Sequence, residues 1–394
     1  MRSYLKLYCA PFRMRIAVLG QFTYPSVCGG LNRIHHIVKP MADHGHEVHL
    51  FSTNLLKGTK KTLPAYEVYQ GIHVHRSPVL LQFGEAYFWR FAQALRSVRP
   101  DVIEVHGYRQ PYSTLALKVA KELGVPCFLT THAPFLDKGL RSWPLELLVV
   151  LYDALLGKRV LNAYTKVLAI SRWEIPLLRK LGCRADKIVY VPNGVAEEFF
   201  HNTKVKKQKQ MILFLGRISP VKDLFTLVKA AALACQKHPS LMFHVVGFSD
   251  GDYEDKVKRL VTKYGLERHF VFPGPVYDLA KKIQYYSEAS LFVLPSRREG
   301  MPQVPLEAMA RGCVVLSSDT DGGKEVVRPE HGFLFPQGDF RKLADLLAYC
   351  LEHDKALEAK REAGRRFARH FRWKLLSQQV EKLYQESIKK ESIS

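Results

Sequence analysis

The feature that most constrains the fold is a regular alternation of short apolar, β-branched runs with helical patterns along the whole chain. The runs that predict buried strands are residues 15–20, 47–52, 101–107, 126–132, 166–171, 187–192, 211–216, 242–247, 291–296 and 313–318. Amphipathic helical patterns lie between them, as at 116–124 and 224–238. Strands that alternate with helices over this length predict an α/β protein with parallel sheets, in which functional loops follow the carboxyl ends of the strands.

The length of 394 residues is enough for two ordinary domains, and an apolar fraction of 47% is typical of globular proteins. The polar, basic segment 201–210 has no hydrophobic period, which indicates a linker. We therefore expect a first domain over 1–200, a second over 201–370 and a terminal helix over 371–394. The apolar residues expected on one face of that helix are Trp373, Leu375, Leu376, Val380, Leu383 and Tyr384.

The cysteine content indicates the redox compartment, and the net charge indicates the class of partners. The seven cysteines are scattered without a C-x-x-C pair, which disfavours a zinc site or a disulfide framework and predicts a soluble protein of the reducing cytoplasm. Lys and Arg exceed Asp and Glu by 59 to 37, a net charge of +22. This excess indicates anionic partners such as phosphates, a nucleic acid, an anionic membrane or an acidic polymer. A solvated basic surface without a partner is the alternative.

The longest apolar run, 143–157, is too short to span a bilayer. A helix over Trp143–Val160, with Lys158 and Arg159, could instead rest on an anionic membrane at the inner face of the cell membrane. An ordinary half-buried helix is the simpler interpretation, which the sequence alone favours. The basic runs lack the interleaved aromatic residues that single-strand binders use, so no nucleic acid is expected as a partner. These runs are 57–61, 204–209, 256–263 and 365–374.

Two segments after predicted strands suit a phosphate-bearing ligand. Gly29 and Gly30 precede a helix, where glycine lets a ligand approach the backbone and the helix N-terminus attracts phosphate. An ordinary strand-helix turn is the alternative for this pair. Arg217 and Lys222 flank a short loop that opens another helix, so they could clamp a diphosphate. Two exposed cations in a basic protein are the alternative there.

A third segment, REGMPQVPLEAMARG at 298–312, carries two acids eight positions apart. Glu299 lies in a loop broken by glycine and proline, and Glu307 lies within a predicted helix over 303–311. Carboxylates accept hydrogen bonds from sugar hydroxyls, so the two acids could hold two separate polyols at the two ends of a diphosphate. A solvated helix residue and a helix-dipole partner are the alternatives.

The order of these segments across two α/β halves resembles the retaining glycosyltransferases of family 4, which have the GT-B fold of two Rossmann-like domains facing across a cleft. The similar motifs are PSVCGGLNR, GHEVHLFS, AISRWEI followed by KIVYVPNGV, GRISPVKD, EGMPQVPLEAMARGCVVLSSDTDGGKEVV and FRW. The resemblance runs from Met14 to the last helix. One departure is Asp223 in GRISPVKD, where glycine is commoner in the family.

The resemblance implies roles for the second half of the chain. Glu299 would contact hydroxyls of the transferred sugar, and Glu307 would bind the ribose of the nucleotide. Arg217 and Lys222 would hold the diphosphate and stabilise its charge as it leaves. Further donor contacts implied in the same way are the sugar pocket at Gly300, Met301 and Pro302 and the base-packing loop 272–276 with Val276.

The resemblance also implies roles for the first half. Gly29 and Gly30 would form the glycine loop of the donor site. His132, in TTHAP at a strand end, is similar to the histidine that faces the reacting sugar on the acceptor side. His106 also matches a family position on that side. A structural hydrogen bond is the alternative role for His132.

The activity so implied is transfer of a hexosyl unit, mannose or glucose, from a nucleotide-diphosphate sugar to an acceptor hydroxyl with retention of configuration. The acceptor would be a lipid-linked or polysaccharide glycan. No cofactor is expected beyond the nucleotide sugar, and no essential metal. The two D-x-D patterns, at 319–321 and 250–252, are assigned to the family's DTDGG loop and to a turn.

Three other functions account for the sequence less well. A glycosidase with Glu299 and Glu307 as its acid pair is rejected, because the diphosphate clamp would have no use. A nucleotide-sugar epimerase on the same fold would need added acid and base groups that the sequence does not offer. A non-catalytic basic binding protein is disfavoured by the intact Arg217, Lys222, Glu299 and Glu307.

Overall fold

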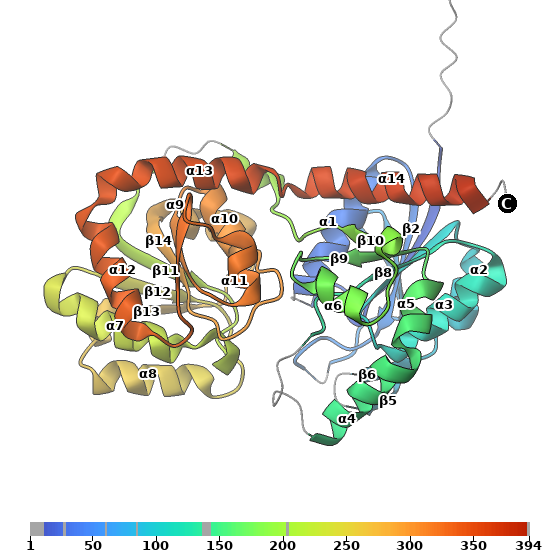
Figure 1. The fold of residues 1–394 in the computed structure, drawn as a ribbon, viewed down its shortest axis with the longest axis horizontal. Helices are drawn as coiled ribbons and strands as arrows, with labels where there is room; N and C mark the ends of the chain where they lie inside the picture. The colour runs from blue at the N-terminus through green and yellow to red at the C-terminus, as the bar shows by residue number, and fades with distance from the viewer. Residues whose placement is uncertain are drawn as a thin grey trace, which may run out of the picture. The chain divides into compact units, whose positions relative to one another are not determined.

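A computed structural model of the chain describes residues 12–26, 29–59, 61–83, 86–135, 143–201 and 205–391. The chain divides into two compact units. The first unit comprises Met1–Ala169, Ile175–Val191 and Ser377–Ser394, and the second comprises Ile170–Glu174 and Pro192–Leu376. Each unit is a layered α/β structure with a mainly parallel sheet, which is the predicted fold class (Figure 1).

The units differ at their edges from the predicted division at 200 and 370. Residues 192–200 and the short segment Ile170–Glu174 belong to the second unit. The last helix belongs to the second unit up to Leu376 and to the first unit from Ser377. Strand β11 (Gln208–Leu215) begins inside the predicted linker, so the linker of 201–210 is shorter than expected. Residues 202–204 of that linker lie outside the described residues.

The first unit is built on an eight-stranded sheet with the order β10-β9-β8-β7-β1-β2-β4-β3, parallel except for β3. Its strands are β1 (Arg15–Leu19), β2 (Glu47–Thr53), β3 (Tyr66–Tyr69), β4 (Ile72–Ser77), β7 (Val102–His106), β8 (Cys127–Thr130), β9 (Lys166–Ala169) and β10 (Ile188–Tyr190). A separate antiparallel pair is formed by β5 (Val79–Phe83) and β6 (Ala86–Trp89).

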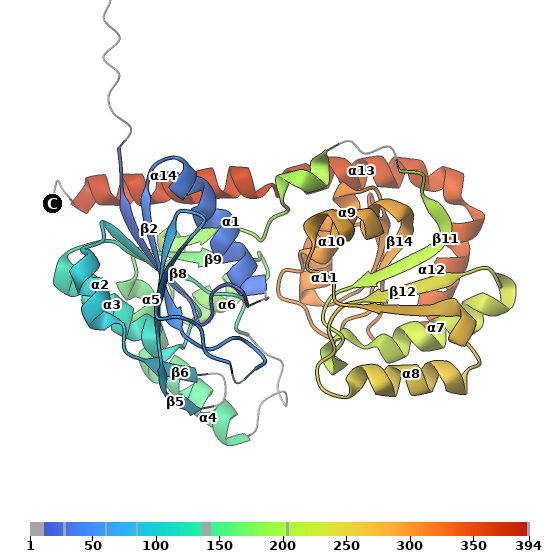
Figure 2. The ribbon, with the colours of Figure 1, turned by 180° about the vertical axis from the view of Figure 1, so that it is seen from behind.

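Helices lie on both faces of this sheet (Figures 1 and 2). They are α1 (Gly29–Asp43), α2 (Ala92–Val98), α3 (Pro111–Leu123), α4 (Trp143–Tyr152), η1 (Asp153–Gly157), α5 (Lys158–Ala163), α6 (Glu174–Lys180) and η2 (Ala185–Lys187). Side chains from α2, α3, α5 and α6 share one buried cluster with the sheet. The other face carries α1 and the last helix, α14 (Trp373–Glu391), which hydrogen-bonds to α1.

The second unit is built on a six-stranded parallel sheet with the order β13-β12-β11-β14-β15-β16. The strands after β11 are β12 (Met242–Val246), β13 (Phe270–Gly274), β14 (Ala289–Leu294), β15 (Val314–Ser318) and β16 (Gly332–Phe335). The helices are α7 (Leu224–Lys237), α8 (Tyr253–Lys263), α9 (Leu279–Glu288), α10 (Val304–Ala310), α11 (Asp321–Val326), α12 (Phe340–Glu352) and α13 (Glu358–Arg369). Short helical turns are η3 (Glu197–Phe200), η4 (Pro220–Lys222), η5 (Glu267–His269) and η6 (Asp354–Leu357). Figure 1 shows α7 and α8 on one side of the sheet and α9 and α10 on the other.

All ten strands expected from apolar runs are present, and in nine of them most residues are buried, because a parallel sheet covered on both faces requires continuous apolar runs. The residues of β10, at the edge of the first unit's sheet, are half-buried. The strands that the apolar runs did not indicate are β3, β4, β5, β6, β13 and β16. In β4, buried and half-buried residues alternate, and histidines occupy the less buried positions. This strand, which lies between β2 and the edge strand β3, therefore has no continuous apolar run to reveal it.

The PNGV segment fixes the start of the last helix. Val195 forms a backbone bridge with Arg372: its amide donates to Phe371 and its carbonyl accepts from Trp373. A side chain at Gly194 would have its Cβ 2.6 Å from the Phe371 carbonyl oxygen, so only glycine allows this approach. The family-like FRW motif at 371–373 is thus held by PNGV within the second unit.

The rest of α14 is anchored in the first unit. The buried face of the whole helix contains Trp373 and Leu376 in the second unit and Val380 and Tyr384 in the first, whereas Leu375 is exposed and does not belong to the predicted apolar face. The Tyr384 hydroxyl donates to the buried carboxylate of Glu104 in β7. Burial alone would raise the pKa of Glu104, but His106 and the donors Thr130 and Tyr384 lower it below its ordinary value, so the carboxylate stays charged.

We predict that Tyr384→Phe destabilises the protein by about 1.5–3 kcal/mol, because it removes a hydrogen bond to a buried charge while preserving the ring. The drop should appear in urea or thermal unfolding followed by circular dichroism. Lys382→Ala on the exposed side of α14 is the control and should change stability by less than about 0.5 kcal/mol. Equal stability of Tyr384→Phe and wild type would show that this hydrogen bond does not hold the helix.

Candidate functional site

The strand order places a crevice in the second unit. The chain moves outward from β11 through β12 to β13, then returns to β14 and moves outward on the other side through β15 to β16. Because β-α-β crossovers are right-handed, this reversal puts neighbouring helices on opposite faces and leaves a crevice after the carboxyl ends of β11 and β14. The loops at that point are 216–223 and 295–303, which carry most of the predicted donor residues.

Lys222 and Glu299 meet at this switch point. The Lys222 ammonium lies 2.5 Å from Oε1 of Glu299, and the Ser296 hydroxyl donates to the same oxygen at 2.6 Å. Both charged side chains are mostly buried, at 17% and 10% exposure. The structure therefore brings together two residues that are 77 positions apart in the sequence and were assigned to neighbouring groups of one ligand.

Side chains outside the predicted site hold the Glu299 loop. The Trp173 indole N–H donates to the Gly300 carbonyl, and the Asn193 amide donates to the Met301 carbonyl, both at 2.8 Å. Within the described residues, the backbone amides of Gly300 and Met301 make no hydrogen bond. Because the carbonyls are fixed and the amides have no described partner, this loop offers two donors to a ligand.

The predicted DTDGG loop also supports Glu299. The Gly322 amide donates to the Glu299 carbonyl at 3.2 Å, and a Cβ at Gly322 would lie 2.6 Å from that oxygen. The Asp319 side chain accepts from the Gln337 amide, and Asp321 opens α11, whose N-cap is Thr320. The motif therefore makes structural contacts, but only Asp319 and Thr320 precede the helix, so the expected DTDGG loop is shorter than predicted.

Glu307 is buried in α10 and has its own partners. Lys282 donates to Oε1 at 2.7 Å, and the Tyr286 hydroxyl donates to Oε2 at 2.9 Å. A carboxylate has about four lone-pair positions, so each oxygen can still accept a ribose hydroxyl. Lys282 and Tyr286 were not predicted from the sequence. They lie four residues apart in α9, and therefore on the same face of that helix.

Arg217 is the more accessible of the two predicted cations. Its side chain is 47% exposed and pairs with Asp250 at 3.4 Å, so Asp250 of the second D-x-D pattern has a cationic partner.

Asp223, which stands where glycine is commoner in the family, has a φ of 43°, in the left-handed region that favours glycine. Its carboxylate accepts from Thr226 and pairs with Arg297, which explains how aspartate occupies this position.

The predicted base-packing loop is partly a strand. Residues 272–274 belong to β13, and only Pro275 and Val276 follow it as a loop. Val276 itself is half-buried at the carboxyl end of that strand. The expectation that the whole of 272–276 is a loop is therefore wrong, and Val276 alone keeps the predicted position.

The first unit has a switch point of its own, between β1 and β7. Gly29 and Gly30 open α1 there, and residues 27 and 28 of the glycine loop lie outside the described residues. A Cβ at Gly30 would lie 3.4 Å from Cε1 of His132, so glycine allows the helix start to approach this ring. His132 has a φ of 59°, an unusual backbone conformation for histidine.

His132 is linked to a buried polar chain. Its Nε2 lies 2.9 Å from Nδ1 of His106, and Nε2 of His106 lies 3.2 Å from Glu104. Burial lowers the pKa of His132 well below its usual value, and the nearby charges of His106 and Arg33 lower it further. His132 is therefore neutral at physiological pH and can accept or donate a hydrogen bond without carrying charge.

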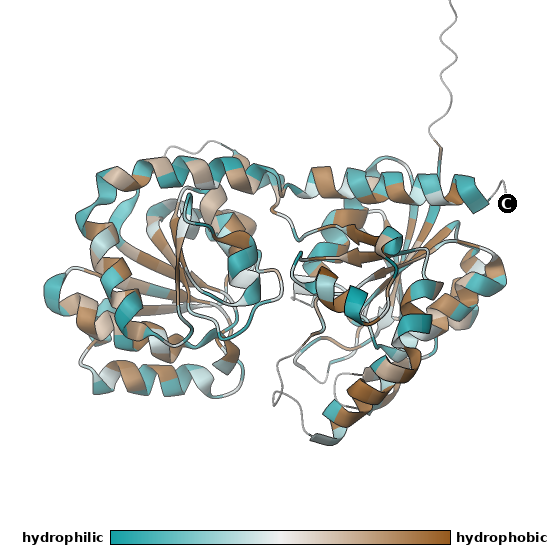
Figure 3. Cartoon of the chain, in the orientation of Figure 1, coloured by the Kyte–Doolittle hydropathy of each residue, from teal (hydrophilic) through white to brown (hydrophobic). Residues whose placement is uncertain are grey.

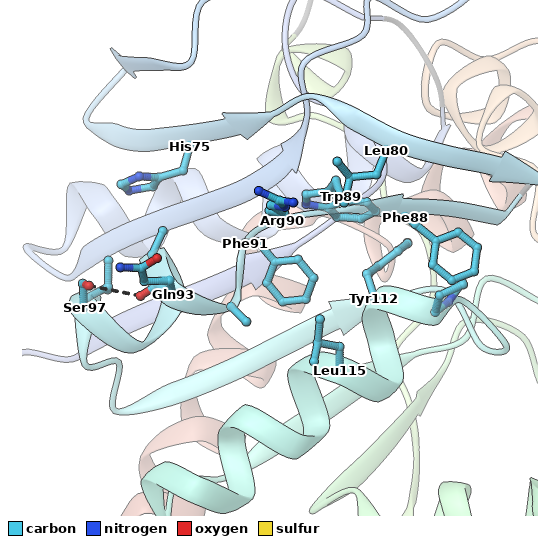
Figure 4. A pocket seen from close by; sticks show the side chains of 14 residues that line it. His75, Leu80, Phe88, Trp89, Arg90, Phe91, Gln93, Ser97, Tyr112 and Leu115 are labelled. Atoms are coloured by element: carbon cyan, nitrogen blue, oxygen red, sulfur yellow. Dashed lines mark hydrogen bonds between the residues drawn. The ribbon is translucent and has the colours of Figure 1, made fainter.

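A large apolar pocket in the first unit was not foreseen from the sequence (Figure 4). It has a volume of about 1060 Å³ and lies among the β5–β6 pair, α2 and α3. Trp89, Phe91 and Tyr112 form its inner wall, and Leu80 and Leu115 lie nearer its rim. None of the predicted site residues lines it, so it is separate from both switch points.

The apolar run 143–157 forms α4 and η1 and is far more exposed than a half-buried helix. No residue of α4 is buried, and Trp143 and Leu155 are 78% and 76% exposed. Most of this helix is brown in Figure 3, which marks its residues as hydrophobic. Among the described helices, none combines the length and the apolar character needed to cross a bilayer.

The described residues contain no cluster of three or more acidic, histidine or cysteine side chains that could hold a metal.

Comparisons with known proteins agree with this geometry. Residues 195–367 match the model of the family described as glycosyl transferases group 1, and residues 29–194 match that of the glycosyl transferase 4-like domain. The chain is 27% identical over 389 residues to a phosphatidyl-myo-inositol mannosyltransferase of Mycobacterium tuberculosis, which covers 94% of this chain and 97% of that protein.

Solved structures share the fold at lower identity. A sucrose-phosphate synthase from Thermosynechococcus elongatus superposes with a TM-score of 0.75 at 21% identity, over 95% of this chain and 99% of that one. Anabaena Alr3699/HepE, solved in complex with UDP-glucose, gives a TM-score of 0.74 at 19% identity, over 95% and 100%. The architecture is therefore GT-B, the fold of a large class of sugar-transferring enzymes. The chain belongs to the group 1 glycosyltransferases, of the family 4 type, and is a glycosyltransferase.

We predict that His132→Gln changes how stability depends on pH. In the wild type the pKa of His132 is lower in the folded than in the unfolded state, so the unfolded state binds the extra proton and stability falls as the pH drops below about 6.5. The variant has no imidazole at this position, so this part of the loss of stability at low pH is absent from it. The difference in unfolding free energy between wild type and variant should therefore shift in the variant's favour by up to about 1.4 kcal/mol per pH unit below that point.

The measurement is urea unfolding of both proteins at several pH values from 7.5 to 5. His201→Gln, which removes an exposed imidazole, is the matched control for losing one histidine. A difference between wild type and His132→Gln that stays constant over the whole range would show that His132 is not held neutral by its surroundings.

Proposed function

We propose that the second unit binds a nucleotide-diphosphate sugar and that the enzyme transfers its hexosyl unit to an acceptor hydroxyl. The observation that carries this proposal is the pairing of Lys222 with Glu299 at the switch point. The bond to be broken joins a sugar carbon to a phosphate oxygen. A cation and a carboxylate 2.5 Å apart are placed to bind the phosphate and the sugar hydroxyls on the two sides of such a bond.

The other donor contacts extend from this pair. Arg217, exposed at the end of β11, would bind the diphosphate together with Lys222. The amides of Gly300 and Met301 would bind the sugar, and Glu307, oriented by Lys282 and Tyr286, would bind the ribose. Gly29 and Gly30 would allow close approach of the donor to the first unit's backbone, and Val276 would pack on the base.

The proposed chemistry needs no metal or other cofactor. The acceptor oxygen forms a bond to the anomeric carbon, the bond from that carbon to the phosphate oxygen breaks, and the departing phosphate takes the acceptor proton on the same face. Configuration is therefore retained. Arg217 and Lys222 stabilise the charge of the leaving diphosphate, and one such preorganised donor contributes about 3 kcal/mol to the transition state.

In the first unit, we assign His132 and His106 to the acceptor side. The neutral imidazole of His132 can hydrogen-bond to a sugar or acceptor hydroxyl without attracting the leaving diphosphate. The named activities and ligands of the relatives support mannose or glucose as the hexose: one relative is called a mannosyltransferase, and Alr3699/HepE was solved with UDP-glucose. A lipid-linked or polysaccharide acceptor is in keeping with the first of these names.

The rival functions have no observation in their favour. An epimerase would need acid and base groups poised at a sugar carbon, and Glu299 is instead paired with Lys222 and Ser296. A protein without catalytic function is disfavoured by the intact set of Arg217, Lys222, Glu299 and Glu307.

We predict that Lys222→Ala lowers transfer by a factor of about 10²–10³, the usual effect of removing one charge-stabilising donor. The first step is to find the donor by thermal unfolding with UDP, GDP and ADP and their sugars, since a ligand at a hundred times its Kd adds about 2.7 kcal/mol of stability. Sugar release is then measured with the donor so found.

Two variants complete this test. Glu307→Ala should cancel the nucleotide-dependent rise in melting temperature, whereas Lys237→Ala, an exposed cation at the end of α7, should leave binding and transfer unchanged. Normal turnover by a folded Lys222→Ala protein would remove Lys222 from the mechanism and with it the proposed site.

We further propose that the enzyme works at the surface of an anionic membrane, at the inner face of the cell membrane. The support is the exposed apolar surface of α4 and η1, which ends at the cations Lys158 and Arg159. Apolar side chains can enter the interface while neighbouring cations bind anionic headgroups. A large exposed apolar surface is otherwise unfavourable for a protein in water.

Flotation with vesicles tests the membrane proposal. Vesicles that contain anionic lipid should carry the wild type upward at low salt and less of it at moderate salt, because headgroup attraction is screened. Trp143→Ser combined with Leu155→Ser should stay at the bottom. The matched control, Tyr277→Ser with Phe248→Ser, removes exposed aromatic side chains from the second unit and should still float. Absence of flotation by the wild type would refute the proposal.

A further inference from the structure

Part of the basic excess gathers at a second pocket in the second unit, on the opposite edge of the sheet from the donor residues. The pocket has a volume of about 540 Å³ and adjoins the amino ends of β11 and β14. The donor loops follow the carboxyl ends of the same two strands. The eight residues of β11, at about 3.3 Å each, separate the two edges by roughly 25 Å. No residue assigned to the donor or acceptor lines this pocket.

Two basic runs that are distant in the sequence converge on it. One is the run 204–209, of which Lys207 and Lys209 line the pocket; Lys204 lies outside the described residues. The other is the run 365–374, which contributes Arg365 and Arg369. The six cationic side chains of the lining are Lys207, Lys209, Arg311, Arg361, Arg365 and Arg369, and the two acidic ones are Asp354 and Glu358. The lining therefore carries a net charge of +4 with histidine neutral.

Structural contacts already use part of this set. Lys207 donates to the carbonyls of Tyr286, Ser287 and Ala289, and Arg311 donates to the carbonyl of His201 at 2.6 Å. Carbonyls are neutral, so these bonds fix the two cations without cancelling their charge. Burial lowers the pKa of Lys207 from its usual value.

The arginines of α13 provide the binding groups. Arg361 is 8% exposed; it bonds to Asp354 and Glu358, and its Nε has no partner among the described residues. Arg365 bonds to Glu358 and Glu362 through Nη2 and Nε, while its Nη1 makes no hydrogen bond in the described part of the chain. Arg369 is exposed and makes no described ion pair. Asp354 also pairs with Lys209 at 3.1 Å, so three carboxylates, Asp354, Glu358 and Glu362, face the six cations of the lining. A net charge of +3 remains, together with guanidinium donors that suit phosphate oxygens.

We propose that this pocket binds a small molecule with two phosphate groups, such as a free or organic diphosphate. The volume lies within the range of small-ligand sites, about 300–1,000 Å³. The cations surround a hollow built from β11, α9, α10 and α13, whereas a nucleic acid or a membrane would require an extended basic face. A diphosphate matches the net charge of the lining more closely than a single phosphate does.

The test is calorimetric titration of the full-length protein with inorganic pyrophosphate at low salt. The proposed donor site can also take pyrophosphate, so the quantity that decides is the change in the number of bound molecules. Arg365→Gln with Arg369→Gln should remove one site, or weaken it roughly tenfold or more for each charge-assisted hydrogen bond lost. Lys209→Gln, on another element of the lining, should weaken the same site.

The matched control is Arg366→Gln with Lys374→Gln, which removes two charges from the same basic run without touching the pocket lining. It should bind as many pyrophosphate molecules as the wild type. Binding that is unchanged in Arg365→Gln/Arg369→Gln, or lost equally in the control, would overturn the proposal. The same titration tests the donor site separately. Of these variants, only Lys222→Ala should remove the pyrophosphate molecule bound at the donor site. Circular dichroism establishes that each variant is folded.

Discussion

The handedness of the β-α-β crossover is the constraint on which the rest of this structure depends. A right-handed crossover places its helix on one face of the sheet, and the direction in which the next strand is added decides which face. Where the strand order reverses, the helices on the two sides of that point therefore lie on opposite faces and leave a crevice between them. In the second unit the reversal lies between β11 and β14, and the loops after these strands bring Lys222 and Glu299 together. The ion pair is thus a consequence of topology as much as of the two residues that form it.

The loops of this crevice are then shaped by small residues and by side chains from elsewhere. Gly322 permits the close approach that its amide makes to the Glu299 carbonyl. Trp173 and Asn193, from two other segments of the second unit, bind the carbonyls of the next two residues. The carbonyl of Glu299 shares a peptide plane with the Gly300 amide, and that of Gly300 with the Met301 amide, so the bonds from Gly322 and Trp173 set the direction of these two amides. The Glu299 loop is therefore held in one conformation by residues from other segments.

The sequence was sufficient for the parallel strands, because they depend on a local pattern, and its motifs pointed to Lys222 and Glu299, which the fold brings together. Buried parallel strands require continuous apolar runs, and glutamate and lysine were recognisable from their motifs. Strand β4 was not predicted because histidines alternate with its buried residues. Lys282 and Tyr286 were missed because only folding brings α9 beside Glu307. The exposure of α4 was also unforeseen, since an apolar helix is equally compatible with a buried position.

The two edges of the second unit's sheet differ in electrostatics for a reason built into the fold. Helices in a parallel α/β unit run opposite to the strands, so their carbonyl ends gather at the amino edge of the sheet. That edge attracts cations, and Lys207 and Arg311 bind carbonyls there. Cations recruited to satisfy helix ends keep their charge, because carbonyls do not neutralise it. Arginines on α13 then add to a field that Asp354 and Glu358 only partly offset. A positive pocket can thus arise on the edge where helix dipoles alone would oppose an anion.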